Sequence, residues 1–235
     1  MRRIVLTAVV VLMVVSSGCV GLITGDTVEF EANESSVNES ALDSTDYELN
    51  NSTERSITRD VSFFGQERTI RIVNQVDRYT SNGSLGDAMD NETLANNETF
   101  QDGMENRTGN TTEVQDIKRF VVVSSPGANV LGQTLNPAAS WSNERILKQV
   151  AGQTGQLNNV EQNDSRTTES LGEERDVTEF IATTEIEGRE VDVRVHVASF
   201  EHEGDVIIAV AVHPEEFDEE DNVDELLGGL EHSGN

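Results

Sequence analysis

The chain has 235 residues and carries 44 Asp and Glu against 16 Lys and Arg, so its formal net charge is −28. This balance argues against sequence-independent binding to nucleic acid, because few cations are present to displace the counterions of the phosphates. The single cysteine, Cys19, excludes an intramolecular disulfide and a thiolate zinc cluster. The length fits one domain of ordinary size with appended segments.

Lysine is rare among the basic residues. The chain has only two lysines, Lys118 and Lys148, against fourteen arginines. At molar salt the Debye length falls to about 3 Å, so acidic side chains no longer repel one another and keep the surface hydrated. The composition therefore indicates a protein adapted to a salt-rich environment. The alternative is an acidic disordered chain, but the strand-like alternation of several segments favours a folded domain.

An export signal is predicted at the start of the chain. Arg2 and Arg3 precede a 12-residue stretch without charge, residues 4–15, and small residues then lead into Cys19. This order of basic, apolar and small segments is typical of a secretory signal peptide. The sequence Ser-Ser-Gly-Cys at residues 16–19 resembles the lipobox of bacterial and archaeal lipoproteins. The resemblance implies that Cys19 becomes the mature N-terminus and attaches the protein to the membrane through lipid.

The two arginines, with the Ile-Val-Leu that follows them, also resemble a twin-arginine export motif. We expect residues 1–18 to be the export signal and residues 19–26 a lipid-anchored tether. The alternative is an uncleaved transmembrane anchor over residues 4–23, a stretch of 20 residues without charge, which is the length a bilayer core requires. Both alternatives place the remaining chain at the extracellular face of the cell membrane, because the positive end stays inside.

Ten Asn-X-Ser/Thr sequons give a second indication of export. Outside the middle of the chain they begin at Asn33, Asn38, Asn50, Asn51 and Asn163. Residues 80–116 lack hydrophobic periodicity and are interpreted as a flexible, Asn- and Thr-rich insertion. This insertion contains the five candidate glycosylation sites, Asn82, Asn91, Asn97, Asn106 and Asn110. An unmodified disordered loop remains the alternative.

We expect residues 27–235 to form a single domain around this insertion. In its first part, residues 27–32 alternate as a short strand and residues 36–45 are compatible with helical turns. Residues 57–64 and 68–79 then form a predicted hairpin around the turn residues 65–67.

The second part contains a continuous apolar run at residues 120–123, as expected of a central strand that ends at Pro126-Gly127. Asn136-Pro137 predicts the start of a helix over residues 137–150, which Gly152 ends. A second helix is predicted over residues 223–230 from the spacing of its apolar residues.

Between these helices lies a predicted three-stranded meander. The turn Glu187-Gly188 predicts four cross-strand pairs: Thr184 with Val191, Ala182 with Val193, Phe180 with Val195, and Thr178 with Val197. A second turn within residues 201–204 predicts four more: Ser199 with Val206, Val197 with Ile208, Val195 with Val210, and Val193 with Val212. The two registers agree on which face of the meander is buried, which is evidence that the meander is real.

Strands and helices with hairpin-length connections predict an α+β class, an antiparallel β-sheet with flanking helices. The order of hairpin, insertion, strand, helix, meander and helix resembles the PsbP-like α/β/α sandwich. The lipobox-like sequence, the acidity, the Asn-rich middle and the Val-rich meander together resemble haloarchaeal surface lipoproteins of families of unknown function. That resemblance implies a location and supplies no activity.

The meander also contains the chain's one candidate polar site. In the predicted register His196 lies opposite Glu179, on the face away from the valines, and Arg194 lies on the same side. A histidine paired with a carboxylate is a general-base arrangement. The alternative is a sheet face with cross-strand charge pairs that is either solvated or covered by the helix over residues 137–150. The apolar residues on this face favour the cover. The acidic run at residues 215–221 is interpreted as a solvated linker, and His202 and His213 as residues at strand ends without a role.

No HExxH spacing, phosphate-loop lysine or nucleophile elbow occurs in the sequence, so no metal, cofactor or catalytic residue is assigned. We expect a non-enzymatic binding or accessory module at the membrane, with envelope proteins or a small ligand as partners. The alternative is a small secreted enzyme that uses Glu179, Arg194 and His196. An open pocket containing these three side chains would favour the enzyme, whereas a covered His196 would exclude it.

Overall fold

The computed structural model describes residues 27–63, 66–81, 118–130, 133–134, 136–154, 157–186 and 189–233. The predicted export signal, with Arg2 and Arg3, and the tether that begins at Cys19 lie outside the described residues. So does most of the predicted insertion, including its five candidate sites Asn82, Asn91, Asn97, Asn106 and Asn110.

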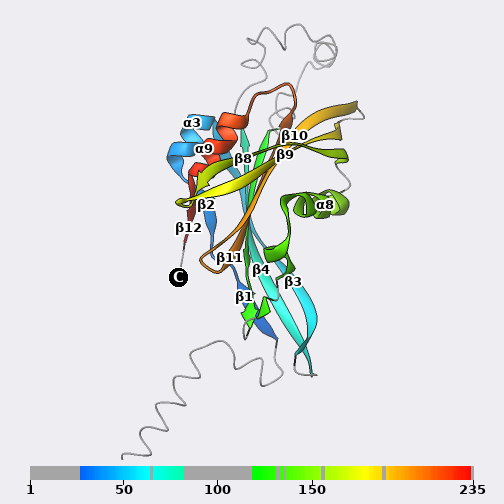
Figure 1. Ribbon diagram of the computed structural model, residues 1–235. Coiled ribbons are helices and arrows are strands. Elements are labelled where there is room, and N and C mark those ends of the chain that lie inside the picture. Colours follow the sequence, from blue (N-terminus) through cyan, green and yellow to red (C-terminus); the bar gives the residue numbers. More distant parts are fainter. Residues whose placement is uncertain are drawn as a thin grey trace, which may run out of the picture.

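One large sheet dominates the described part of the chain (Figure 1). Its strand order is β1-β4-β5-β11-β10-β9-β8. Strand β3 lies outside this order and pairs with β4 along the whole length of β4. The strands are β1 (Val28–Glu31), β3 (Tyr47–Phe63), β4 (Gln66–Ser81), β5 (Arg119–Pro126), β8 (Asn158–Ser170), β9 (Glu173–Ile186), β10 (Arg189–His202) and β11 (Asp205–Pro214). All neighbours are antiparallel except β1 and β4, which run parallel, so the sheet is mixed rather than purely antiparallel. The domain is compatible with the α+β class but is mostly β.

The pairing of β9 with β10 confirms the register predicted from the Glu-Gly turn. Phe180 pairs with Val195 and Thr178 with Val197, and His196 lies opposite Glu179. The turn residues themselves, 187–188, lie outside the described residues. The hairpin of β3 and β4 is also confirmed, although β3 begins much earlier than the predicted residue 57.

The predicted register between β10 and β11 is wrong by two residues. Val197 pairs with Val210 and Val195 with Val212, because the turn contains only Glu203 and Gly204. Both turn residues have positive φ, 47° and 92°, as the two-residue turns that suit twisted hairpins require. Since side chains alternate with a period of two, this shift leaves each residue on the face that was predicted for it.

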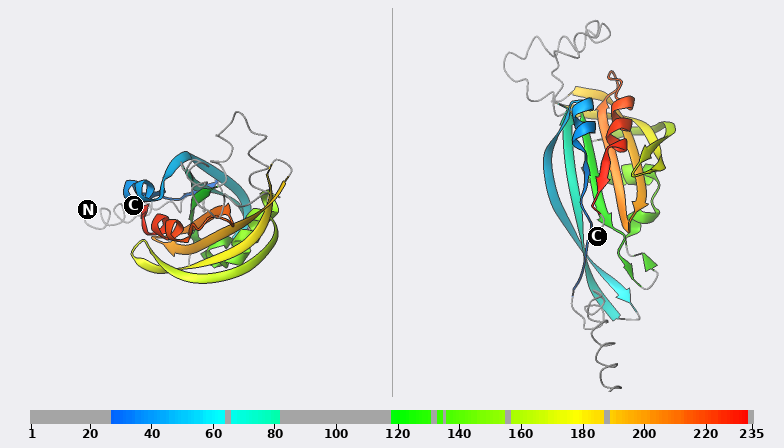
Figure 2. Two further views of the ribbon diagram at one scale, coloured as in Figure 1. Left: turned by 90° about the horizontal axis from the view of Figure 1, so that it is seen from above. Right: turned by 90° about the vertical axis from the view of Figure 1, so that its left-hand side faces the viewer.

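The two faces of the sheet are covered by different helices. Helix α8 (Asn143–Thr154) packs on the valine face of β9 and β10, while α3 (Glu39–Thr45) and α9 (Glu220–Gly228) lie on the opposite face (Figure 2). Two short strands, β2 (Ser35–Val37) and β12 (Leu230–His232), pair beside α3 and α9. The short strands β6 (Asn129–Val130) and β7 (Gln133–Thr134) form a separate pair.

The helix predicted over residues 137–150 is not continuous. Pro137–Ser140 forms a 3-10 turn, Trp141 is extended, and α8 begins only at Asn143. The Ser142 hydroxyl accepts a hydrogen bond from the Arg145 backbone N–H, as a helix-capping side chain does. The helix also covers the valine face, so the prediction that it covers His196 is wrong.

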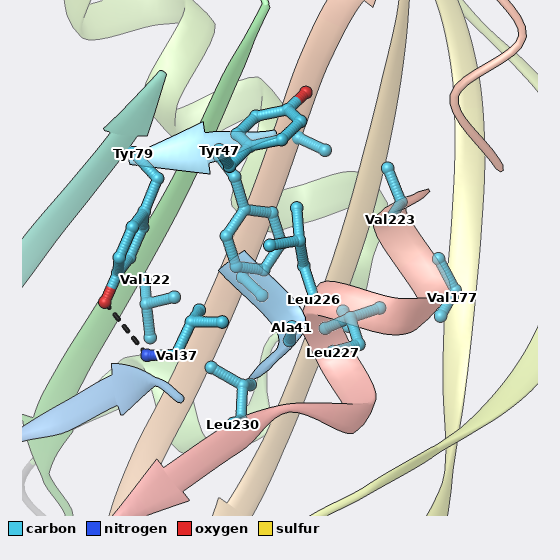
Figure 3. Close-up of a cluster of buried hydrophobic side chains, with 14 of the residues drawn as sticks. Val37, Ala41, Tyr47, Tyr79, Val122, Val177, Val223, Leu226, Leu227 and Leu230 are labelled. Atoms are coloured by element: carbon cyan, nitrogen blue, oxygen red, sulfur yellow. Dashed lines mark hydrogen bonds between the residues drawn. The ribbon is translucent and has the colours of Figure 1, made fainter. Parts of the chain in front are cut away.

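The larger buried core lies beneath α3 and α9 (Figure 3). In α9, Val223, Leu226 and Leu227 follow the spacing of one helical face and are all buried. Tyr79 joins β4 to this core, because its hydroxyl accepts a hydrogen bond from the Val37 backbone N–H at 2.9 Å. Burial, as the largest cause, raises the pKa of Tyr79 to about 12. The face that carries His196 is thus packed against α9.

Candidate functional site

A pocket of about 300 Å³ opens where the apolar core beneath α9 ends. Strands β9, β10 and β11 form its floor, and the loop between β11 and α9 forms its wall. Its lining residues are Glu179, Arg194, His196, His213, Glu215, Glu216, Phe217, Asp218, Glu219 and Glu220. The three residues singled out from the sequence, Glu179, Arg194 and His196, therefore do lie together in one pocket.

Glu179 is held in place by two donors. Its Oε1 accepts hydrogen bonds from Asn163 Nδ2 at 2.6 Å and from Arg194 Nη1 at 3.1 Å, while the carboxylate is almost fully buried. Arg194 also reaches the rim of the pocket, where its Nη2 lies 3.6 Å from Glu215 Oε1. The arginine thus links the buried floor to the acidic loop.

His196 and His213 form a directly hydrogen-bonded pair in the floor. Their Nε2 atoms are 2.9 Å apart, and their rings stack with centroids separated by 5.1 Å. On the other side of the pair, Arg166 Nη1 lies 3.1 Å from His196 Nδ1, and His213 Nδ1 lies 2.9 Å from the Pro214 carbonyl oxygen. All four ring nitrogens are therefore engaged.

These partners define the protonation of both rings. Arginine only donates, so His196 Nδ1 accepts and its Nε2 carries the proton. A carbonyl only accepts, so His213 Nδ1 carries the proton and its Nε2 accepts from His196. The hydrogen bonds run in one direction from Arg166 through both rings to Pro214, and both histidines are neutral.

The surroundings also favour the neutral rings. Burial is the largest cause that lowers the pKa of His196 to about 3, and electrostatic interactions with His213, Arg166 and Arg194 contribute to the same shift. Burial likewise lowers the pKa of His213. A second proton on His196 would place its Nδ1–H against an N–H of Arg166, and a second proton on His213 would place its Nε2–H against that of His196.

Arg166 also joins β8 to α9. Its Nε and Nη2 donate to the carboxylate of Asp224 at 2.8–3.2 Å, and Glu220 lies 3.8 Å away. Such two-nitrogen contacts with a carboxylate are among the stronger side-chain interactions. Arg166 thus links the middle of α9, at Asp224, to His196 in the floor.

A second buried cluster borders the pocket around Glu219. Lys118 forms an ion pair with Glu219, and the amide of Asn222 and the hydroxyl of Tyr47 donate to the same carboxylate. Burial and the negative charge of Glu219 raise the pKa of Tyr47 above its ordinary value. The Lys118 ammonium also lies over the ring of Phe217, 4.2 Å from its centroid.

The structure assigns roles to residues that the sequence reasoning missed. His213 is part of the floor rather than an incidental strand end, and the acidic run that was interpreted as a solvated linker forms the pocket wall and the start of α9. With the correct turn, Arg194 pairs directly with His213, so the turn type is the signal that could have found this histidine. Arg166 comes from β8, a polar strand that was not predicted.

The arrangement leaves no ring nitrogen available for proton transfer to a ligand. His196 and His213 are only 2% and 1% exposed, and each ring nitrogen already has a partner. A general base must reach the proton that it abstracts, so this pair serves as a rigid floor. In the described ranges, no three His, Cys, Asp or Glu side chains are grouped as a metal ion would require.

A second polar constellation lies beside β12. Ser35 Oγ is 2.8 Å from His232 Nδ1, and His232 Nε2 is 3.4 Å from Asp205 Oδ2. The residue types are those of a serine nucleophile with its base, but Ser35 is 4% exposed and the imidazole is fully buried. These contacts fasten the C-terminal strand to the sheet.

The fold and the site define a mostly β domain with one large mixed sheet, helices on both of its faces, and a polar pocket at the start of α9. The chain belongs to the family described as a domain of unknown function, DUF6517, whose model matches residues 34–231. Comparison with curated proteins gives no match. Within the described ranges, no helix has both the length and the apolar character to cross a membrane.

Proposed function

We propose that this protein is a membrane-anchored extracellular lipoprotein of a halophile and acts as a non-enzymatic binding module. The anchor is the lipid on Cys19, and the acidic surface keeps the domain soluble in concentrated salt. The pocket beside α9 is the binding site. This location and this role rest on the basic and apolar segments before Cys19, on the composition, and on the form of the pocket.

The observation that carries the binding role is the satisfied floor of the pocket. Glu179, His196 and His213 have protein partners, so the floor is preorganised and a ligand does not have to reorganise it. The volume of about 300 Å³ lies at the small end of ligand pockets. The site therefore fits a small polar solute better than a protein segment.

The charge of the lining favours a solute that carries a positive charge. Six carboxylates line the pocket against one arginine. Arg194 partners Glu179 and Glu215, Lys118 partners Glu219, and Arg166 Nε lies 3.8 Å from Glu220 Oε1. Three cations thus face the six carboxylates, and the net charge of the lining stays negative at the rim. We propose that an ammonium group lies against this rim.

Calorimetry on the mature chain in molar salt tests the binding role. The probes are small ammonium compounds, with neutral amides and carboxylates of the same carbon skeleton as comparisons. We expect only the ammonium series to bind, and Asp218→Asn to weaken binding by about tenfold, since Asp218 is an exposed carboxylate of the lining and a hydrogen bond to a charged group contributes about 1.5–3 kcal/mol. Glu144→Gln is the matched control, because Glu144 is an exposed carboxylate on α8 that pairs with Lys148.

Equal weakening by Asp218→Asn and Glu144→Gln, or preference for the carboxylate series, would contradict this site. Chemical conversion of a bound probe would instead support the enzyme alternative with Glu179, Arg194 and His196.

Anchoring is tested separately with Cys19→Ser, which we expect to release the protein from the membrane fraction. A variant that stays fully bound would indicate a transmembrane anchor.

A further inference from the structure

Strand β3 forms an exposed edge of the sheet. It has 17 residues and pairs only with β4 in the described part of the chain. Leu49 and Ile57 on this strand are 50% and 47% exposed. A long edge strand with exposed apolar side chains can pair with another chain, and natural proteins usually protect such edges.

A β-bulge interrupts this edge at Asn50. Leu49 pairs with Tyr79 and Asn51 with Arg78, so Asn50 has no partner in the β3–β4 register. Asn50 and the two residues after it, Asn51 and Ser52, are exposed. The sequence Asn50-Asn51-Ser52 is also a sequon, at a point where the backbone already departs from the regular strand.

In each of the other sequons of the described residues, the Asn or the hydroxyl residue is already engaged, although Asn163 and Ser165 are themselves exposed. Asn38 Oδ1 accepts the backbone N–H of Ala41 as the N-cap of α3. Asn163 Nδ2 donates to Glu179. The sequon at Asn33 ends in Ser35, whose hydroxyl is buried against His232.

The sequon at Asn51 overlaps that of Asn50 but uses a different hydroxyl. Its third residue, Thr53, is half-buried and accepts a hydrogen bond from Arg78 Nη1 at 3.4 Å. Ser52, the third residue of the Asn50 sequon, is exposed. The geometry therefore favours Asn50 over its neighbour.

We propose that Asn50 is an N-glycosylation site. The inference rests on the proposed extracellular location. The donor is a sugar linked through its anomeric carbon to the phosphate of a lipid carrier, and a membrane transferase supplies the catalysis. Asn50 Nδ2 forms a bond to the anomeric carbon, the bond from that carbon to the phosphate oxygen breaks, and the lipid phosphate leaves with the electron pair. The amide loses one proton to a base of the transferase.

A glycan at Asn50 projects from the outer edge of the sheet. A hydrated sugar chain at the bulge prevents a second strand from pairing along β3, including β3 of another copy. The glycan thus supplies the edge protection that the exposed Leu49 and Ile57 otherwise lack.

Two single substitutions separate the overlapping sequons. Ser52→Ala removes the Asn50 sequon and leaves Asn51-Ala-Thr53 intact, whereas Thr53→Ala does the reverse. The full chain is expressed in a salt-loving archaeal host and analysed by peptide mass spectrometry. We expect a glycan at Asn50 in the wild type and in Thr53→Ala, none in Ser52→Ala, and none at Asn38 or Asn163. Size-exclusion chromatography of Ser52→Ala is expected to show added oligomers.

Other patterns overturn the inference. A glycan that persists in Ser52→Ala and disappears in Thr53→Ala would assign Asn51 instead. Protease added to intact cells reports the location independently. A protease-sensitive chain with an unmodified Asn50 refutes the glycan alone, whereas a protected chain with an unmodified Asn50 refutes both the glycan and the extracellular location.

Discussion

Acidification tests the one-way hydrogen-bond chain in the pocket floor. In the folded protein the pKa of His196 is about 3, whereas an unperturbed histidine has a pKa of 6.5. Between these values the unfolded chain binds a proton at this residue that the folded chain does not. Stability is therefore fully present above pH 6.5 and decreases as the pH falls towards 3.

The size of the effect follows from the two pKa values. One additional proton on the unfolded state changes the free energy of unfolding by about 1.4 kcal/mol per pH unit. From pH 6.5 to 4.5 His196 alone accounts for a loss of roughly 2–3 kcal/mol. The lowered pKa of His213 adds to the loss in the same direction.

The variant His196→Gln isolates this contribution. A glutamine carbonyl can accept from Arg166 and its amide can donate to His213, but the side chain does not titrate. Urea unfolding at constant molar salt from pH 7.5 to 4.5 measures the free energy of unfolding of both proteins. Carboxylate titration affects both equally, so the difference between their slopes reports His196.

We expect a shallower decrease in His196→Gln, by about 1 kcal/mol per pH unit in the steepest range. Equal slopes in the two proteins would refute the assignment of a neutral, buried His196. If acidification raised the free energy of unfolding of the wild type relative to that of the variant, the direction of the hydrogen-bond chain from Arg166 to Pro214 would be refuted as well.

Three further experiments test the packing of α3 and α9, each by chemical unfolding at fixed pH. A Cβ at Gly229 would overlap that of Ala41, so Gly229→Ala is expected to cost about 1–3 kcal/mol, and adding Ala41→Gly should recover most of it; no recovery would contradict the close approach of α3 and α9. A double-mutant cycle of Arg166→Ala and Asp224→Ala should give a coupling of about 1–2 kcal/mol, and a value near zero would show that this ion pair does not hold α9. Asn38→Ala removes the N-cap of α3 and should cost about 1 kcal/mol, while an unchanged midpoint would argue that the cap is dispensable.

The sequence predicted the β9–β10 pairing because turn residues and alternating valines point to the same register. It failed by two residues between β10 and β11, where the residues that form the turn were placed too broadly. With the wrong register, each side chain of β10 and β11 was still assigned to the correct face of the sheet. The pairing of Arg194 with His213 was not predicted. Glu179, Arg194 and His196 could therefore be placed together from the first turn and the strand alternation, whereas His213 could not.

The remaining parts of the site depend on elements with weak sequence signals. Strand β8 is mostly polar and exposed, so the alternation of apolar and polar residues that indicates a strand is absent, and the sequence does not indicate that Arg166 contacts His196. The acidic residues before α9 have the composition of a solvated linker, yet tertiary contacts with Lys118 and Arg194 fold them over the sheet. The PsbP-like resemblance stays a prediction.

The parallel pairing of β1 with β4 has a mechanical consequence for a protein tethered by its N-terminus. Residues Val28–Glu31 are the first described segment after the proposed anchor, and they lie beside Ile70–Val73 in the middle of β4. Tension from the membrane would act along β1, so its hydrogen bonds to β4 would be loaded together in shear rather than opened one at a time. The domain would then resist pulling at its point of attachment while the pocket, at the far strands of the sheet, stayed undistorted.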